Sequence, residues 1–419
     1  MNPYYEEELA AVYHGDCIDV MRELPDGSVD AVVTDPPYGI RFMGESWDGA
    51  DIVKRQERGK ATSPMPAGVG GPNGGYRSLA AEAGRYNRSL KASLAFMDWC
   101  REWASECLRV LKPGGHMLAF GSPRCYHQLG MGIELAGFEV RDTIAWLFGQ
   151  GFPKSLDVAK AIETKGGDAR PWYGWGTALK PAFEPCVVAR RPLCGTFEGS
   201  VADNVLASGV GALNIDACRI YTEGSEGCEY KVKRFKSGSE LAKTKGNWRP
   251  DDGEEYVGKT ADGRWPTNVA LDVAAADELD AQTGDLSDAK PHTLRRRGIG
   301  YGSGSTGGDV ELGYEDSGGA SRFFPAFRYE AKASSAERPK AGGVQHPTVK
   351  PLDLMRWLVR LVAPQGATIL EPFAGSGTTI EACIAEGMRC IAIEREETYL
   401  PLILNRISKP IDVPLPLGI

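Results

Sequence analysis

Short apolar runs alternate with longer amphipathic stretches over the first 150 residues. Four of the runs predict strands, at residues 11–14, 29–33, 116–121 and 138–148. Three stretches between them place apolar side chains at helical spacing and predict helices, at residues 18–24, 90–111 and 126–136. Strands that alternate with helices are typical of a parallel sheet covered by helices, so this region predicts an α/β fold.

The alternation breaks down in the middle of the chain and returns near its end. Residues 154–163 predict one more helix and residues 185–190 one more strand. From residue 193 to 343 glycines are frequent, charges cluster and apolar runs are short. The pattern then again predicts helices at 352–362, 376–386 and 397–407, and strands at 367–370 and 390–393. We therefore expect three parts, residues 1–192, 193–343 and 344–419, of which the middle one is an insert.

Residues 41–88 have no periodicity and are rich in Gly, Pro, Ser, Asn and Arg. Such a composition is incompatible with a regular helix or strand. Long loops of this kind are more often functional or mobile than structural. We expect a flexible flap beside an active site.

The turn Thr34-Asp35-Pro36-Pro37-Tyr38-Gly39 follows the predicted strand at 29–33. Two prolines end the strand because neither can donate to a ladder, which leaves an acid and an aromatic ring at its carboxyl end. In open α/β sheets ligands bind at that edge. Asp35 and the Pro36 carbonyl can accept the two hydrogens of an exocyclic amine, and Tyr38 can stack on its ring. An ordinary strand-ending turn is the alternative that these residues alone leave open.

A second motif, Glu371 to Thr379, lies between a predicted strand and a predicted helix. Its glycines let the backbone approach a ligand, and the helix start offers free N–H groups. Glu394 ends the next strand about 20 residues later, where an acid can hold a ribose diol. The pattern predicts an adenosine-bearing cofactor. The third glycine of a dinucleotide site and the Gly-Lys-Ser/Thr of a phosphate loop are both missing, which disfavours NAD and nucleoside triphosphates.

Three motifs in this order resemble a known family. Asp-Pro-Pro-Tyr at 35–38, His346-Pro347-Thr348-x-Lys350-Pro351, and Phe373-x-Gly375-x-Gly377 look like the circularly permuted, beta-group DNA amino-methyltransferases, which methylate adenine N6 or cytosine N4. The resemblance covers residues 11–190 and 344–407. It implies a Rossmann-like, circularly permuted methyltransferase sheet, with residues 193–343 as an irregular target-recognition domain.

The resemblance also implies roles for individual residues. Asp16 would meet the adenine of S-adenosylmethionine, Glu394 its ribose hydroxyls, and Thr348 and Lys350 would lie near its methionine end. The catalytic set would be Asp35, Pro36, Pro37 and Tyr38. The cofactor-binding set would be Asp16, Cys17, Asp35, His346, Thr348, Lys350, Glu371, Pro372, Phe373, Ala374, Gly375, Ser376, Gly377, Thr378 and Glu394.

We expect methylation of adenine N6 in DNA, by base flipping and direct in-line transfer, with no metal. Cytosine N4 methylation is the nearest alternative. Cytosine N4 enzymes of this family more often have Ser where this chain has Asp35, so the resemblance favours adenine. A second alternative is a DNA-binding homologue without activity. A third is methylation of a protein glutamine or an RNA base, for which relatives usually have Asn at this position.

Charge and aromatic residues suggest where DNA would bind. The net charge of −8 argues against a protein that coats nucleic acid indiscriminately. The insert nevertheless contains basic clusters that can contact phosphates, with solvated loop charge as the alternative: Lys231, Lys233, Arg234, Lys236, Arg249, Arg295, Arg296 and Arg297. Six aromatic residues lie among them and predict either base stacking or a small core: Trp248, Trp265, Phe323, Phe324, Phe327 and Tyr329.

Composition indicates the compartment and limits the partners. Hydrophobic residues make up 42% of the chain, and no apolar run reaches the roughly 20 residues of a membrane span. The acidic start lacks the regions of a signal peptide, and the ten cysteines include no CxxC pair, so they indicate buried thiols in a cytoplasmic protein. Double-stranded DNA is the expected partner. The resemblance leaves open a homodimer and a cognate restriction endonuclease.

Overall fold

The computed structural model describes residues 2–39, 90–149, 151, 155–194, 200–222, 229–235, 253–259, 262–287, 292–294, 310–312, 317–327, 344, 346 and 348–409. The predicted flap at 41–88 lies outside them. The chain forms two compact units, one of residues 1–214, 268–274 and 327–419, the other of residues 215–267 and 275–326. The expected insert, 193–343, overlaps the second unit without coinciding with it, because α7 (Val201–Ser208) and β9 (Val269–Asp272) belong to the first.

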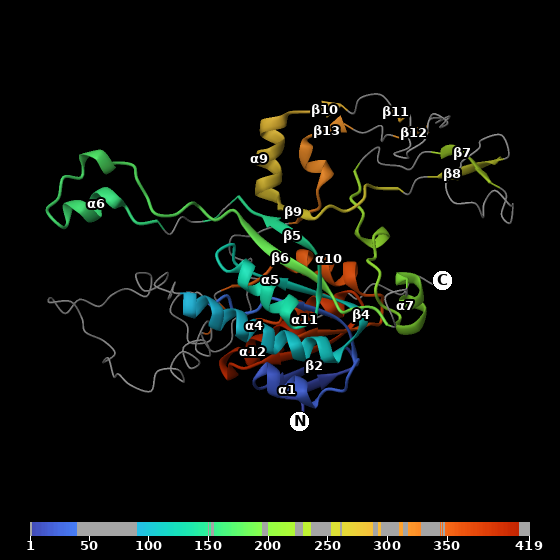
Figure 1. Cartoon of the computed structure of the whole chain (residues 1–419), viewed down its shortest axis with the longest axis horizontal. Helices are drawn as coiled ribbons and strands as arrows, with labels where there is room; N and C mark the ends of the chain where they lie inside the picture. The colour runs from blue at the N-terminus through green and yellow to red at the C-terminus, as the bar shows by residue number, and fades with distance from the viewer. Residues whose placement is uncertain are drawn as a thin grey trace. The chain divides into compact units, whose positions relative to one another are not determined.

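One sheet of ten strands organises the first unit, in the order β1-β2-β16-β15-β3-β4-β6-β5-β9-β14 (Figure 1). Their bounds are β1 (Tyr5–Glu7), β2 (Ala10–His14), β16 (Arg389–Glu394), β15 (Thr368–Glu371), β3 (Val29–Thr34), β4 (Leu111–Phe120), β6 (Phe183–Arg190), β5 (Glu139–Leu147), β9 and β14 (Ala326–Phe327). The strands predicted in the first 150 residues run in one direction, as expected. β6 lies antiparallel between β4 and β5, a reversal that the pattern did not predict.

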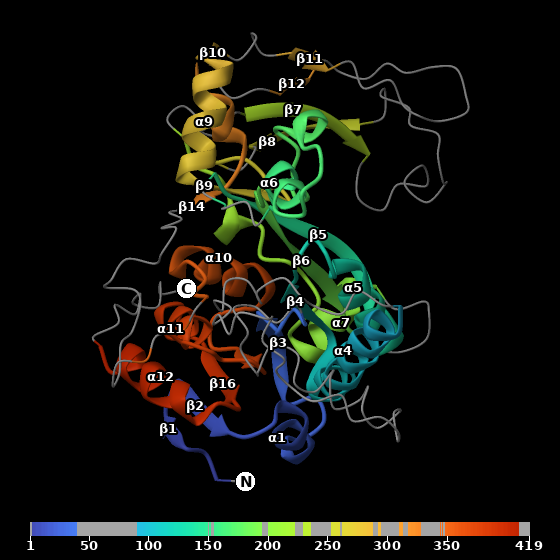
Figure 2. The same cartoon turned by 90° about the vertical axis from the view of Figure 1, so that its left-hand side faces the viewer.

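Helices cover both faces of this sheet (Figure 2). Along one face lie α1 (Cys17–Glu23), α4 (Leu90–Val110) and α5 (Tyr126–Leu135), and along the other α10 (Leu352–Val362), α11 (Thr378–Ala385) and α12 (Leu400–Ile407). The core joins α4 side chains such as Trp103 to strand residues such as Val32 and Met117. No helix in the described part of the chain combines the length and apolar character that a membrane crossing requires.

Two helix boundaries differ from the predicted ones. The helix predicted from Ser376 begins at Thr378, because Gly377 adopts a left-handed conformation with φ 81° as its N-cap. The helix predicted through Leu111 ends at Val110, where β4 begins directly. β4 contains a bulge there: Val29 pairs with Leu111, whereas Ala31 pairs with His116. Residues 112–115, which separate the predicted helix from the predicted strand at 116–121, are therefore part of an irregular strand.

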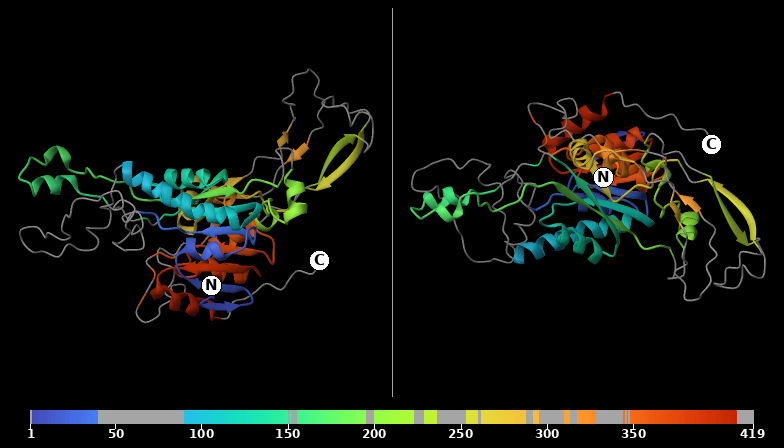
Figure 3. Two further views of the ribbon diagram at one scale, coloured as in Figure 1. Left: turned by 60° about the horizontal axis from the view of Figure 1, so that its bottom comes forward. Right: turned by 90° about the horizontal axis from the view of Figure 1, so that it is seen from above.

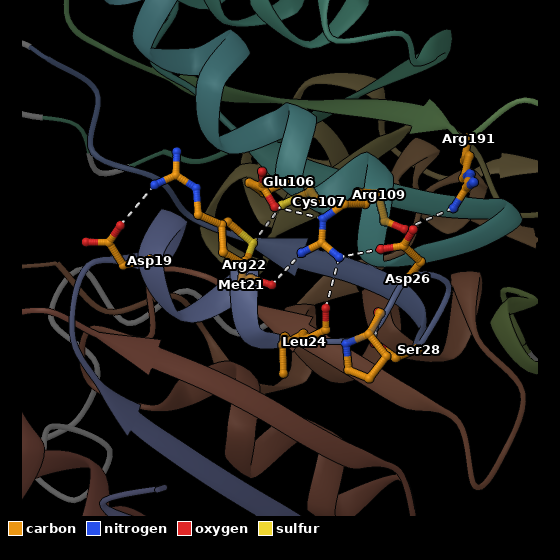
Figure 4. Close-up of polar contacts among 11 residues, drawn as sticks. Asp19, Met21, Arg22, Leu24, Asp26, Ser28, Glu106, Cys107, Arg109 and Arg191 are labelled. Atoms are coloured by element: carbon orange, nitrogen blue, oxygen red, sulfur yellow. Dashed lines mark hydrogen bonds and ion pairs between the residues drawn. The ribbon is translucent and has the colours of Figure 1, made fainter. Parts of the chain in front are cut away.

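Arg109 of α4 holds the end of α1 in place (Figure 4). Its guanidinium donates to the carbonyl oxygens of Met21 at 2.6 Å and Leu24 at 2.9 Å, and pairs with Asp26 at 2.5 Å and Glu106 at 2.9 Å. Carbonyls at a helix C-terminus have no partner within the helix, so a cation there is favourable. This contact positions the turn from which β3 starts.

The second unit is built from short elements. It contains most of α9 (Val273–Thr283), the 3₁₀ turns η3 (Asp216–Cys218) and η5 (Ala320–Phe323), and three two-stranded sheets. These sheets pair β7 (Glu229–Phe235) with β8 (Gly253–Lys259), β10 (Leu286–Ser287) with β13 (Ser317–Gly318), and β11 (His292–Leu294) with β12 (Val310–Leu312). Asp280 of α9 accepts from the Ser321 backbone and hydroxyl, both at 2.7 Å, which ties the helix to η5.

Candidate active site

Four parallel neighbours, β2, β16, β15 and β3, end at one edge of the sheet. Four acids at or just after the ends of these strands therefore meet there, although up to 378 positions separate them in the sequence: Asp16, Asp35, Glu371 and Glu394. This is the edge at which open α/β sheets bind ligands. The structure thus brings together the two motifs that the sequence singled out.

Asp35 lies at the end of the fully buried strand β3 with 24% of its side chain exposed. Its Oδ1 accepts from the Tyr38 hydroxyl at 2.8 Å, and its Oδ2 from the Lys350 ammonium at 2.6 Å. The turn between Asp35 and Tyr38 folds back, and it buries Pro36. Burial and the nearby Asp35 carboxylate raise the pKa of the Tyr38 phenol well above its usual value, so this residue is a neutral donor.

Lys350 is the cation of this site. Its Nζ contacts Glu184 at 3.1 Å as well as Asp35, and lies 4.7 Å from the centre of the Phe120 ring. Burial lowers the pKa of Lys350, but the two carboxylates outweigh burial and raise it above its usual value, so Lys350 stays charged. The family resemblance predicted Lys350 near the methionine end of the cofactor. In the structure its ammonium contacts the Asp35 carboxylate.

Glu184 is a site residue that sequence reasoning missed. It is the second residue of β6 and shares Lys350 with Asp35. Only the antiparallel direction of β6 places its start at this edge, and strand direction leaves no mark in a local apolar pattern. The only sign of this role in the sequence is an acid at the start of a mostly apolar strand.

The loop from Glu371 to Gly377 forms the neighbouring part of the site. Gly375 and Gly377 have φ angles of 53° and 81°, which side-chain-bearing residues rarely adopt. The Gly375 N–H donates to Glu394 Oε2 at 2.7 Å, and the Glu396 N–H to Oε1 at 2.8 Å. Burial raises the pKa of Glu394 to about 7, although both backbone hydrogen bonds act to lower it. The carboxyl of Glu394 is therefore oriented before any ligand arrives.

Glu371 braces the two motifs against each other. It is buried and accepts from the hydroxyls of Thr34 at 2.5 Å and Thr379 at 2.6 Å, and from the Phe373 N–H at 3.0 Å. Burial raises its pKa to about 8, against the effect of these hydrogen bonds. Since Thr34 precedes Asp35, this carboxyl links the Asp35 turn directly to the Gly375 loop.

The other predicted cofactor residues line or support this loop. His346 packs edge-on against Tyr399 with ring centres 4.7 Å apart, and its Nδ1 contacts the Thr348 carbonyl. Phe373 packs against Trp103 with ring centres 5.5 Å apart. Pro372, Ala374, Ser376 and Thr378 are buried in the loop and the first turn of α11.

Asp16 and Cys17 lie beside Glu394. The Gly15 N–H donates to the Glu394 carbonyl at 3.0 Å, and Asp16 Oδ1 caps α1 by accepting from the Ile18 N–H at 3.0 Å. Cys17 is buried, which raises the pKa of its thiol well above the usual value. Among the described residues, no group of three His, Cys, Asp or Glu side chains is placed to hold a metal ion.

The predicted DNA contacts are only partly described. Lys231, Lys233 and Arg234 lie in β7, whose backbone pairs with β8. The remaining predicted contacts, Lys236, Arg249, Arg295, Arg296 and Arg297, lie outside the described residues, as do Trp248 and Tyr329.

The described aromatic residues of the predicted insert have different surroundings. Trp265 is 64% exposed with Arg219 over its ring at 5.5 Å, whereas Phe323 has the guanidinium groups of Arg264 and Arg322 within 4.6 Å of its centre. Phe327 belongs to the first unit, where it packs against Trp146 and Trp357 with ring centres 6.1 and 5.7 Å apart. Phe327 therefore contributes to packing of the first unit and not to a core of the predicted insert.

Comparison with known proteins places this site in a family. A model of the N6/N4 DNA methylases, described as DNA methylase, matches residues 29–165 and 231–405. The type II methyltransferase M.HindIII of Haemophilus influenzae is 26% identical over 49% of this chain and 65% of its own length. M.BamHI of Bacillus amyloliquefaciens is 24% identical over 30% of this chain and 20% of its own. The chain thus spans less than two thirds of either relative.

Two solved structures align with most of the chain at low similarity. The PvuII DNA methyltransferase, titled cytosine-N4-specific, aligns with 97% of this chain and 89% of its own at 13% identity and a TM-score of 0.44. A complex of M1.HpyAVI with SAM aligns with 96% of this chain and 100% of its own at 16% identity and a TM-score of 0.40. Because the family model covers more than half of the chain, including both the Asp35 turn and the Gly375 loop, the chain belongs to the N6/N4 DNA methylase family.

Proposed function

We propose that this protein is a DNA methyltransferase that transfers a methyl group from S-adenosylmethionine to N6 of adenine. The observation that carries the proposal is the meeting of the Asp35 turn with the Gly375 loop and Glu394 at one edge of the sheet. Family membership supports DNA as the substrate class. Asp35, in place of the Ser more common in cytosine enzymes, favours adenine.

The residues at this edge fit the proposed cofactor. Gly375 and Gly377 have no side chains, so a ligand can approach the backbone closely there. The carboxyl of Glu394 is already oriented by hydrogen bonds and could accept from ribose hydroxyls. Asp16 lies beside Glu394, at the place proposed for the adenine. When bound, the sulfonium of S-adenosylmethionine supplies an electrophilic methyl group.

Asp35 makes the target nitrogen nucleophilic. The lone pair of an exocyclic amine is delocalised into the ring, so the amine is a poor nucleophile. Asp35 Oδ2 and the Pro36 carbonyl accept its two hydrogens and favour a tetrahedral nitrogen that can attack in line. Positioning and electrostatic stabilisation supply most of the rate, and no covalent enzyme intermediate forms. The methylated nitrogen then releases one proton, which Asp35 would accept.

Lys350 and Tyr38 occupy the Asp35 oxygens that the amine must reach. Glu184 offers Lys350 a second carboxylate at 3.1 Å, so the ammonium can move toward Glu184 as the amine takes its place. The base must leave the duplex to arrive here, at a cost of a few kcal/mol. Stacking on Tyr38 offsets part of that cost.

The chain order of the strands supports a circularly permuted fold. β15 and β16, which flank the cofactor loop, come last in the chain but lie between β2 and β3. We also propose that the insert at 193–343 reads the target sequence, because its sequence contains the clustered basic residues.

Cytosine N4 is the second candidate, because the family includes both kinds of enzyme. The test is incubation with labelled S-adenosylmethionine and unmethylated genomic DNA, followed by mass analysis of the nucleosides. N6-methyladenine is the expected product. N4-methylcytosine would overturn the base assignment, and methyl incorporation into RNA or protein alone would overturn DNA as the substrate.

A further inference from the structure

The connection between β5 and β6 starts and ends at the catalytic edge of the sheet. β6 pairs antiparallel with both β4 and β5, and Glu184 at its start contacts Lys350. The described part of the connection, residues 155–182, contains α6 (Val158–Glu163) and projects beyond the ends of these strands (Figures 1 and 3). We call residues 155–182 the β5–β6 excursion.

The excursion is held together by its own hydrogen bonds. At its neck Ser155 Oγ accepts from the Thr177 N–H at 2.9 Å, and Thr177 Oγ1 accepts from the Leu156 N–H at 3.0 Å. Asp157 caps α6 through the Lys160 N–H at 3.0 Å, and the Val158 N–H donates to the Trp175 carbonyl at 3.1 Å. These hydrogen bonds give the tip of the excursion a defined conformation.

Three aromatic side chains are exposed on this tip. Trp172, Tyr173 and Trp175 are 40%, 62% and 60% exposed, and the two indoles pack edge to face with ring centres 5.3 Å apart. The Tyr173 hydroxyl donates to Glu163 at 2.9 Å. A cluster of exposed aromatic rings is unfavourable in water, and such clusters mark surfaces that bind a partner.

The charge of the excursion limits how it can bind. It contains four basic residues against three acids, and Arg170 already pairs with Asp168 at 2.8 Å. A surface so close to neutral neutralises few phosphates. Its rings must bind through stacking or apolar contact, and every DNA base offers a face for stacking.

We propose that Trp172, Tyr173 and Trp175 contact the bases of duplex DNA beside the flipped target. Aromatic and apolar side chains that insert at a base step unstack it, which makes flipping of a neighbouring base easier. The excursion leaves the sheet at the edge where Asp35 lies, because Glu184 at its root shares Lys350 with Asp35. The proposal rests on DNA as the substrate but not on which base is methylated.

The test compares the double variant Trp172→Ala/Trp175→Ala with wild-type protein and with Tyr4→Ala. Tyr4 is a matched control, because it is 51% exposed beside β1 at the opposite end of the sheet. Equilibrium binding of unmethylated duplex DNA is measured at several salt concentrations, together with the KM for DNA and the affinity for S-adenosylmethionine.

We expect the double variant to bind DNA roughly five- to fifty-fold more weakly, as for the loss of one stacked base. The slope of log affinity against log salt stays at the wild-type value, because no phosphate contact is removed. Cofactor affinity is unchanged.

Equal DNA affinity and equal KM in the double variant and the Tyr4→Ala control would overturn the proposal. Loss of self-association in place of DNA binding would overturn it too and assign the rings to a second copy of the chain. Nucleoside analysis of the wild-type reaction tests the proposed function separately, since it reports the base methylated by the intact protein.

Discussion

The Asp35 turn and the Gly375 loop follow neighbouring strands, yet their acids have opposite surroundings. Glu371 and Glu394 are buried and accept hydrogen bonds only from neutral hydroxyls and backbone N–H groups in the contacts described. Burial dominates there, and the pKa values rise to about 8 and about 7. Asp35, a quarter exposed, is paired with the Lys350 ammonium.

We propose that the difference follows from the role of each acid. Glu371 and Glu394 shape their loop through fixed neutral donors, and burial raises the pKa of both carboxyls. In the proposed mechanism Asp35 accepts hydrogens from the target amine, and the Lys350 ammonium contacts it at 2.6 Å. The same edge of one sheet thus contains buried acids held by neutral donors and a part-exposed acid paired with a lysine.

Among the substitutions that test this comparison, Asp35→Ala should have the largest effect, a loss of methyl transfer. Removing a group that polarises the nucleophile typically reduces rate by about 10²–10⁴-fold. We expect methyl transfer to fall by this amount while S-adenosylmethionine still binds, because Glu394 and the Gly375 loop are untouched. Single-turnover transfer and calorimetric cofactor titration measure the two effects. The control is Asp98→Ala, an exposed acid on α4; an equal loss there would remove the special role of Asp35.

Lys350→Met should show that the ammonium also holds the site together. This substitution leaves Asp35 and Glu184 facing each other without their shared cation. We expect it to destabilise the fold by about 2–3 kcal/mol. The cost is below that of a fully buried pair, because both acids are partly exposed. Denaturant unfolding measures this. Adding Asp35→Asn removes one of the two charges and should restore part of the loss. Strictly additive effects would contradict the shared contact.

Glu371→Gln should change how stability depends on pH. The folded-state pKa of Glu371, about 8, lies above the ordinary value of 4.5, so the folded state keeps a proton that the unfolded chain releases. This contribution to stability is present below pH 4.5 and is lost as pH rises through 8, at up to roughly 1.4 kcal/mol per pH unit. The stability of the Glu371→Gln variant should therefore decline less than that of the wild type between pH 6 and 8. Thermal unfolding across this range measures it, and parallel curves would refute the assignment.

Glu184→Gln should have the smallest effect, a modest decrease in kcat. Without its second carboxylate, Lys350 pairs with Asp35 alone and hinders the incoming amine more. We expect kcat to fall by about two- to five-fold, below the effect of a direct proton acceptor, with the KM for DNA unchanged. Glu184→Asp keeps the charge and should retain more activity than Glu184→Gln. A larger effect on the KM than on kcat would instead place Glu184 in DNA binding.

Local chemistry predicted much of the first unit and of its site. The apolar run before Asp35, the two prolines after it and the glycines at 375 and 377 act over a few residues, and the structure has a strand end and left-handed glycines at these positions. Helices such as α10 follow from apolar spacing, because a buried face repeats every turn. These features need no knowledge of distant parts of the chain.

Contacts between distant segments were decided only by the tertiary structure. Lys350 reaches Asp35 across 315 positions, and Glu371 reaches Thr34 across 337. Both contacts depend on β15 pairing beside β3, and Glu184 enters the site only because β6 runs antiparallel. Strand neighbours and directions are set by the packing of the whole sheet and its helices. A local pattern therefore singled out Asp35, while the Lys350 ammonium that pairs with it became visible only in the folded chain.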